Sequence, residues 1–370
     1  MTQFIPRCAA ALIKADDLAY LRLTRRDLPR AVRFFSDFGL QVAARTERAV
    51  YLRGCLAQHH CVIVEQAEHD GFAALGIHAV SRADLDKLAA AFGTPVDSID
   101  EPGGGQIVRL RDPSGFPVEV VHGTEELPAL PQRAARALNQ PLHKARINAP
   151  QPILLGPAEV YRLGHAVMTR QEFAKNANWY VETFGLIASD VEVLAGSREP
   201  VLAFMRFDRG ATPADHHNIV IAAGPEDGYA HSAFETLDID SLGGGAEWLQ
   251  YQGWIKAWGI GRHVLGSQLF CYHYDSSGFE VEHYIDGDVF DADYPTRYHP
   301  AGTCGLYLWG PELPEQFIDL AMTPTRIASI VRGLRNRADF SLSRLLALKN
   351  AYTAKARPWI GKTLRKPTAH

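Results

Sequence analysis

The sequence predicts an α+β protein of two similar domains, because one pattern of strand, helix and turn occurs twice in its 370 residues. Residues 111–121 read RDPSGFPVEVV, and residues 274–284 read YDSSGFEVEHY. Upstream of these copies, LAYLRLTRRDLPRAVRFFSDFGL (18–40) matches LGHAVMTRQEFAKNANWYVETFGL (163–186). The duplication therefore predicts two domains of the same fold in one chain.

Each copy opens with a short alternating strand followed by an amphipathic helix. The helices carry apolar stripes at helical spacing and end at a glycine, Gly39 or Gly185. Turn residues then separate further strands, such as CVIVEQ and QIVRLR in the first copy and VLAFMRF and NIVIAAG in the second. One βαβββ module is too small to close its own core. We therefore expect two paired modules per domain, forming a half-barrel of mostly antiparallel strands.

The predicted boundaries are residues 1–140 for the first domain, 141–158 for a linker, 159–310 for the second domain and 311–370 for a basic, partly helical extension. Residues 122–158 are rich in Pro, Ala and Gln, which favours a linker with some helix. Residues 321–370 hold eleven Lys or Arg against one acid, Asp339. Apolar residues recur there at helical spacing. We favour helices packed on the body or on another subunit over a nucleic-acid-binding arm, and expect a homo-oligomer.

The composition is that of a globular protein, with 46% hydrophobic and 22% charged residues and a net charge of −4. No apolar run approaches the length that spans a membrane. The five cysteines are scattered and form no CxxC motif, which argues against a disulfide framework. We expect a cytoplasmic protein that binds neither membrane nor nucleic acid.

The two copies differ at the positions that a metal ion requires. On the first strand, the second copy has His165 where the first has Tyr20. On a middle strand, the second copy has His231, where the first offers only Phe or Ala. Both copies keep a glutamate on the last strand, Glu119 and Glu282. The second copy alone therefore offers a three-ligand set, and Glu119 is interpreted as a polar strand position.

Two neutral imidazoles and one carboxylate can occupy one face of an octahedron. Such a facial set is typical of Fe(II) oxygen chemistry, and Mn(II) fits the same ligands. A single strand histidine is more often part of a hydrogen-bonded scaffold than a ligand. Here, however, all three ligand types occur at equivalent places of one repeat. This coincidence favours a metal site at His165, His231 and Glu282.

The ligand-bearing segments LGHAVM (163–168), YAHSAFET (229–236) and YHYDSSGFEVEHY (272–284) resemble those of the type I extradiol ring-cleaving dioxygenases of the vicinal oxygen chelate superfamily. The resemblance covers about residues 15–310. It implies the glyoxalase/bleomycin-resistance/extradiol dioxygenase fold and a metal-free amino-terminal domain. It also implies that His165, His231 and Glu282 bind Fe(II).

Three further positions resemble catalytic residues of that family. His217 resembles the histidine beside the oxygen site, with its neighbour His216 as the alternative. His263 resembles the histidine that bonds a substrate hydroxyl, and Tyr272 the tyrosine near the attacked carbon. One departure is Ser276, where the family commonly has proline.

The resemblance implies Fe(II)-dependent extradiol cleavage of a catechol by O2, giving a hydroxymuconic semialdehyde-type product in aromatic catabolism. One alternative is another metal-dependent enzyme of the superfamily, either an isomerase or lyase or a keto-acid dioxygenase. A second alternative is a non-catalytic aromatic-binding protein. His217, His263 and Tyr272 favour ring cleavage. One-ring, substituted and two-ring catechols all stay open as substrates.

Overall fold

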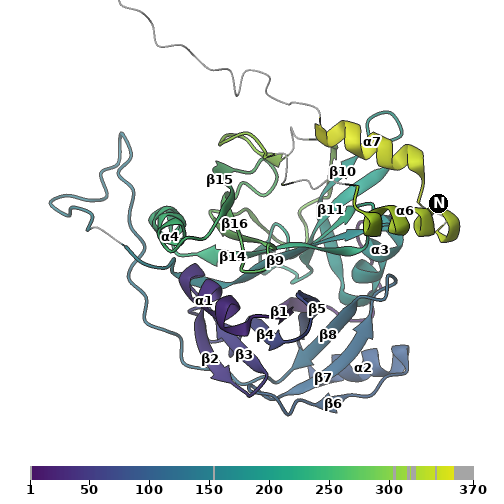
Figure 1. Ribbon diagram of the computed structural model, residues 1–370, viewed down its shortest axis with the longest axis horizontal. Helices are drawn as coiled ribbons and strands as arrows, with labels where there is room; N and C mark the ends of the chain where they lie inside the picture. The colour runs from purple at the N-terminus through teal and green to yellow at the C-terminus, as the bar shows by residue number, and fades with distance from the viewer. Residues whose placement is uncertain are drawn as a thin grey trace, which may run out of the picture.

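The computed structural model describes residues 2–152, 155–302, 306–314, 317, 322–337 and 340–353. Cys304 and the end of the extension, residues 354–370, lie outside the described residues. The chain forms two sheet-containing domains, drawn one above the other in Figure 1, with the first domain below.

The first domain is built on an eight-stranded sheet with the strand order β2-β3-β4-β1-β5-β8-β7-β6. In chain order its elements are β1 (Ala15–Arg25), α1 (Leu28–Phe38), β2 (Gln41–Arg45), β3 (Ala49–Arg53), β4 (Val62–Gln66), β5 (Gly71–Ala79), α2 (Arg82–Phe92), β6 (Asp97–Ser98), β7 (Gln106–Arg111) and β8 (Pro117–His122).

The second domain repeats this plan in a nine-stranded sheet with the order β15-β16-β17-β14-β9-β13-β11-β10-β19. Its elements are β9 (Val160–Arg170), α3 (Phe173–Phe184), β10 (Leu186–Val193), β11 (Pro200–Phe207), β12 (Ala214–Asp215), β13 (Ile219–Ala223), β14 (Gly228–Thr236), α4 (Ile239–Tyr251), β15 (Lys256–Arg262), β16 (Leu269–Tyr274), β17 (Glu280–Ile285), β18 (Val289–Phe290) and β19 (Arg297–Pro300). Two helices follow, α6 (Pro324–Asn336) and α7 (Leu342–Thr353).

Each sheet is built from two βαβββ modules, and β19 adds a ninth strand to the second sheet beside β10. In the first domain β1 pairs in parallel with β4, and β5 in parallel with β8. The two modules join where β1 and β5 run antiparallel. The second domain has the same three pairings, between β9 and β13, β14 and β17, and β14 and β9. The predicted α+β fold of paired modules is confirmed.

The repeated sequence phrase builds the same turn in both domains. Asp112 Oδ1 accepts hydrogen bonds from the backbone N–H groups of Ser114 and Phe116, at 2.9 and 3.0 Å. Asp275 makes the same two bonds in its own turn, at 2.8 and 2.9 Å. Gly278 has a φ of 86°, a left-handed conformation that glycine adopts without strain. The turn of the duplicated phrase therefore connects strands in the same way in both domains.

The helix expected in the linker is a wrong prediction. The described residues between β8 and β9 contain no helix. Proline lacks the backbone N–H that a helix needs, and this segment contains several prolines. They are Pro128, Pro131, Pro141, Pro150, Pro152 and Pro157.

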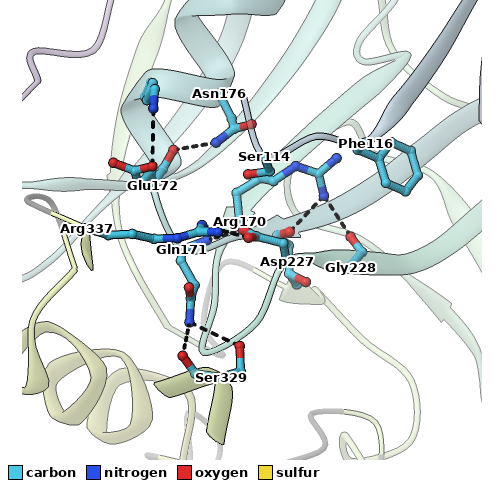
Figure 2. Close-up of polar contacts among 12 residues, drawn as sticks. Ser114, Phe116, Arg170, Gln171, Glu172, Asn176, Asp227, Gly228, Ser329 and Arg337 are labelled. Atoms are coloured by element: carbon cyan, nitrogen blue, oxygen red, sulfur yellow. Dashed lines mark hydrogen bonds and ion pairs between the residues drawn. The ribbon is translucent and has the colours of Figure 1, made fainter. Parts of the chain in front are cut away.

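Helices α6 and α7 pack on the second domain, beside α3, β10 and β11 (Figure 1). Figure 2 shows how α6 is held: the Gln171 side chain donates to the carbonyl of Ser329 at 3.2 Å, and Arg337 forms a 2.6 Å ion pair with Asp227. The expected packing of the extension on the body is therefore observed for its described part. None of the described helices has the length and apolar character needed to cross a bilayer.

Candidate metal centre

Three neighbouring strands of the second sheet bring His165, His231 and Glu282 together. The strands are β9, β14 and β17, and one candidate ligand atom from each side chain lies within 4.8 Å of the others. Glu282 Oε2 is 3.3 Å from His165 Nε2 and 3.5 Å from His231 Nε2. These residues are far apart in sequence, and the sheet places them on one face of the half-barrel.

The chemistry of this cluster fits a divalent cation. Glu282 is fully buried, and neither of its carboxylate oxygens has a hydrogen-bond partner in the described part of the chain. A buried carboxylate without such partners is costly unless a charge compensates it. Burial lowers the pKa of His231, which favours the neutral imidazole that a metal requires. Burial would raise the pKa of Glu282, but the adjacent histidines hold it well below its usual value.

His263 and Tyr272 form a hydrogen-bonded pair beside the cluster. His263 Nδ1 lies 2.5 Å from the carbonyl oxygen of Leu306, so this nitrogen carries the proton. Its Nε2 then accepts the Tyr272 hydroxyl at 3.0 Å and lies 3.5 Å from Glu282 Oε1. Burial raises the pKa of Tyr272 well above its ordinary value, so the phenol stays protonated. The Tyr272 proton and the His263 Nε2 lone pair are both used in this bond, so the phenol oxygen of Tyr272 is the acceptor that the pair offers next to the candidate metal position.

His217 lies against the first imidazole of the cluster. It belongs to the loop between β12 and β13, and its ring centre is 4.2 Å from that of His165. Its Nδ1 is bonded to Nδ1 of His216 at 2.8 Å. The structure therefore brings His217 to the cluster, whereas His216 lies behind it and reaches the cluster only through His217.

These side chains open onto a cavity of about 1040 Å³. His165, His217, His231, His263 and Tyr272 all line it. Apolar residues from α6 and α7 line it as well, among them Ile330, Leu342, Leu345, Leu346 and Leu348. Five of the six residues singled out from the sequence thus line one cavity, and the sixth, Glu282, is buried next to His165 and His231. The extension forms part of the cavity wall.

The first domain lacks the donor set at the equivalent position. In the second domain, His231 of β14 pairs with Val167 of β9. In the first domain, Arg22 of β1 takes the place of Val167, and its partner on β5 is Ala74. Ala74 therefore stands in place of the second imidazole, as Tyr20 stands in place of the first.

A guanidinium supplies positive charge there instead. Arg22 Nε and the Tyr20 hydroxyl both donate to Glu119 Oε2, at 3.0 and 2.7 Å. Arg22 also forms ion pairs with Glu65 and Glu101. Glu119 is thus neutralised by a side chain of the protein itself, which explains how a carboxylate persists at this position without a metal ligand role.

Sequence reasoning missed a second repeated feature, a pair of adjacent histidines. His59 and His60 are joined through their Nδ1 atoms at 2.9 Å, as are His216 and His217. The signal was present as QHHC (58–61) and DHHN (215–218), each directly before a core strand.

The comparisons with known proteins agree with this fold and cluster. A model of the Glyoxalase/Bleomycin resistance protein/Dioxygenase superfamily matches residues 162–283, a segment that contains His165, His231 and Glu282. The second domain is therefore a domain of this superfamily.

Individual proteins extend the likeness to most of the chain. Metapyrocatechase 2 of Cupriavidus necator is 28% identical over 301 residues, covering 79% of this chain and 88% of that protein. The Mn(II)-bound glyoxalase from Novosphingobium aromaticivorans has a TM-score of 0.69 at 22% identity, covering 84% of this chain and 96% of its own. Homoprotocatechuate 2,3-dioxygenase from Arthrobacter globiformis has a TM-score of 0.67 at 22% identity, covering 83% and 91%. The resemblance to extradiol dioxygenases is confirmed, and the two structures share the fold.

Proposed function

We propose that this chain is an extradiol dioxygenase, which opens a catechol ring beside its two hydroxyl groups and incorporates both atoms of O2. The observation that carries the proposal is the buried cluster of His165, His231 and Glu282 at a cavity that also contains proton-exchanging side chains. The similarity to a protein named Metapyrocatechase 2 supports the same reaction class.

The proposed cofactor is Fe(II), held by His165, His231 and Glu282. Two imidazoles and one carboxylate suit Fe(II) and leave coordination positions for other ligands. Mn(II) fits the same donors, and the glyoxalase from Novosphingobium aromaticivorans, which has a similar fold, is a Mn(II)-bound structure. When bound, the metal supplies Lewis acidity toward the catechol oxygens and activates dioxygen.

The protein's own groups orient the catechol and move its protons. Tyr272 presents a phenol that burial keeps protonated, and His263 is fixed by hydrogen bonds at both nitrogens. The Tyr272 oxygen is placed to accept a hydrogen bond from a substrate hydroxyl, and His263 holds this phenol in position. His217, packed against His165, is placed on the same cavity to accept a proton from the substrate and return it later.

The cavity favours a catechol that carries an apolar substituent or a second ring. Its volume of about 1040 Å³ is at the upper end for small-molecule sites. Its wall includes several leucines of α7, which offer apolar surface to a substituent, beside Lys349 of the same helix. Cleavage of such a catechol would give a ring-opened, hydroxymuconic semialdehyde-type product, as a step in the catabolism of aromatic compounds.

A second candidate is a metal-dependent isomerase of the same superfamily, favoured by the similarity to the Mn(II)-bound glyoxalase. Fold and ligand set alone serve several reactions. A non-catalytic aromatic binder has no need for the buried cluster. We also propose a cytoplasmic location, which the free thiols of Cys8, Cys55, Cys61 and Cys271 support. Homo-oligomer formation stays a prediction.

The test is an oxygen-uptake screen. The protein is loaded anaerobically with one equivalent of Fe(II), and then given catechol, 3-methylcatechol or 2,3-dihydroxybiphenyl. Ring cleavage predicts one O2 consumed per catechol and a yellow product, with 2,3-dihydroxybiphenyl preferred. Iron-loaded, folded protein that consumes no O2 with any of the three would reject the proposal and favour the isomerase.

A further inference from the structure

A chain of three buried side chains leads away from the cavity to β10. His216 Nε2 lies 2.6 Å from Asp190 Oδ2, and His216 Nδ1 lies 2.8 Å from His217 Nδ1. Asp190 and His216 are fully buried, and His217 is only 4% exposed. The chain therefore connects a cavity-lining imidazole to a carboxylate without a gap.

The chemistry of each group fixes where the protons lie. Asp190 is ionised, because bonds from His216, Arg297 and His299 outweigh burial and hold its pKa well below the usual value. A carboxylate only accepts hydrogen bonds, so the proton between these two groups belongs to His216 Nε2. Burial lowers the pKa of His216 more than Asp190 raises it, so His216 is neutral and its Nδ1 has no proton.

The remaining bond, between the two Nδ1 atoms, then has one direction. Since His216 Nδ1 is an acceptor, His217 Nδ1 must be the donor. We propose that Asp190 and His216 are positioning residues that hold His217 as its Nδ1–H tautomer, with the lone pair of Nε2 available to the cavity. This inference builds on the proposed function, in which His217 accepts a substrate proton.

The groups around His216 are consistent with this arrangement. Asp190, Asp288 and Arg297 act on it electrostatically, and His217 is bonded to it. Asp190 is also bonded by Arg297, at 2.8 and 2.9 Å, and by His299, at 2.7 Å. Its negative charge is thus stabilised without a proton from His216.

The first domain provides a natural comparison. It contains the same histidine pair, His59 and His60, with the same Nδ1–Nδ1 contact. At the position of Asp190 the first domain has Ala44. Ala44 of β2 pairs with Tyr51 of β3, just as Asp190 of β10 pairs with Phe204 of β11. The histidine pair thus occurs in both domains, whereas the carboxylate occurs only beside the candidate metal cluster. This difference links the carboxylate to the chemistry of the second domain rather than to the fold.

The tautomer matters because the two forms of neutral histidine do opposite things. With Nδ1 protonated, His217 offers a base to the substrate through Nε2. The other tautomer would present an N–H group at the same place. The positive charge that forms on His217 after proton uptake is stabilised through His216 by Asp190, in the manner known from catalytic triads.

The direct test is the ¹⁵N NMR spectrum of imidazole-labelled, metal-free protein, with His217 assigned by the loss of its signals in His217→Gln. The wild type should show the proton on Nδ1. His216→Asn keeps an acceptor near the same place and should preserve this state, whereas His216→Leu should release His217 to the Nε2–H tautomer. A wild-type His217 protonated on Nε2 would overturn the inference, whether or not the protein cleaves any catechol.

A kinetic experiment on iron-loaded protein separates positioning from packing. His216→Leu should lower kcat by about 100-fold, within the usual range for general acid–base catalysis, with KM and iron content unchanged. His216→Asn should keep most of the turnover. The matched control is His59→Leu, the same change in the first domain. Its kcat, KM and iron content should equal those of the wild type, and its melting temperature should be close to that of His216→Leu. Equal loss of kcat in His59→Leu and His216→Leu, or loss of iron in His216→Leu, would contradict the positioning role.

Discussion

Arg170 of β9 donates two hydrogen bonds to Asp112, at 2.7 and 3.0 Å, across the boundary between the domains. Both side chains are fully buried. Arg25 and Asp275 form the same buried pair in the opposite direction, so each repeated turn receives the arginine of the other domain. Figure 2 shows Arg170 between Phe116 of the first domain and Gly228 of the second. The duplicated phrase thus fastens the domains together through two related ion pairs.

This arrangement predicts a large stability cost for removing one partner. Asp112→Ala would leave the Arg170 guanidinium buried without its counter-charge, and we expect the free energy of unfolding to fall by about 3–5 kcal/mol. Urea denaturation measures it. The control is Asp97→Ala, which breaks the half-exposed pair with Arg109 and should change stability by at most about 1 kcal/mol. Similar values for the two variants would refute the structural role of the buried pair.

His217→Ala should separate chemistry from binding. His217 contacts the cluster without belonging to the ligand set, so the variant should keep one equivalent of iron and a near-normal KM for the catechol. Its kcat should fall by roughly 10²–10⁴-fold, the range of general acid–base catalysis. Steady-state oxygen uptake and metal analysis provide both numbers. Unchanged turnover would remove His217 from the mechanism.

Glu192 gives the protein a stability that declines as pH rises. Burial raises the pKa of this carboxyl from 4.5 to about 7, while the Tyr352 hydroxyl donates to it at 2.6 Å. The folded state therefore holds the proton longer than the unfolded chain. Its stabilising contribution is complete below about pH 4.5 and is lost as pH rises toward about 7, on the order of 3 kcal/mol.

Glu192→Gln should remove this decline. Urea unfolding of wild type and variant between pH 4 and pH 8 tests it, and the two stability curves should diverge progressively over the window. Parallel curves would mean that Glu192 ionises normally in the folded protein.

Leu345 of α7 tests the part of the cavity wall contributed by the extension. Leu345→Trp fills part of the cavity and should raise KM for 2,3-dihydroxybiphenyl by about tenfold or more, because overpacking typically costs about 1–3 kcal/mol. The KM for unsubstituted catechol should change little. Parallel effects on the two substrates would indicate that the larger one binds elsewhere.

The fold and the metal cluster could be predicted from the sequence because both depend on short motifs and on the comparison of two copies of a repeat. A strand, a helix and a turn with fixed spacing occur twice, and His165, His231 and Glu282 stand out where the copies differ. Strand alternation then places them on one face of a sheet.

Contacts between distant segments were beyond that reasoning. The pairing of Asp190 with His216 joins a strand to a loop 26 residues away, and no periodicity announces it. Similarly, Arg22 resembles any charged strand residue until Glu65, Glu101 and Glu119 are seen around it. The helical spacing in the extension predicted α6 and α7, but only their packing places Leu345 at the cavity.

The most direct test of the whole account follows both oxygen atoms of O2. Iron-loaded protein is supplied with ¹⁸O2 and 2,3-dihydroxybiphenyl, and the ring-opened product is analysed by mass spectrometry after rapid quenching. We predict two ¹⁸O atoms per product for wild type and for Glu119→Gln, which alters only the first domain, and neither bound iron nor product for His231→Ala. Full activity in iron-free His231→Ala, or a product without ¹⁸O from the wild type, would contradict ring cleavage at this centre.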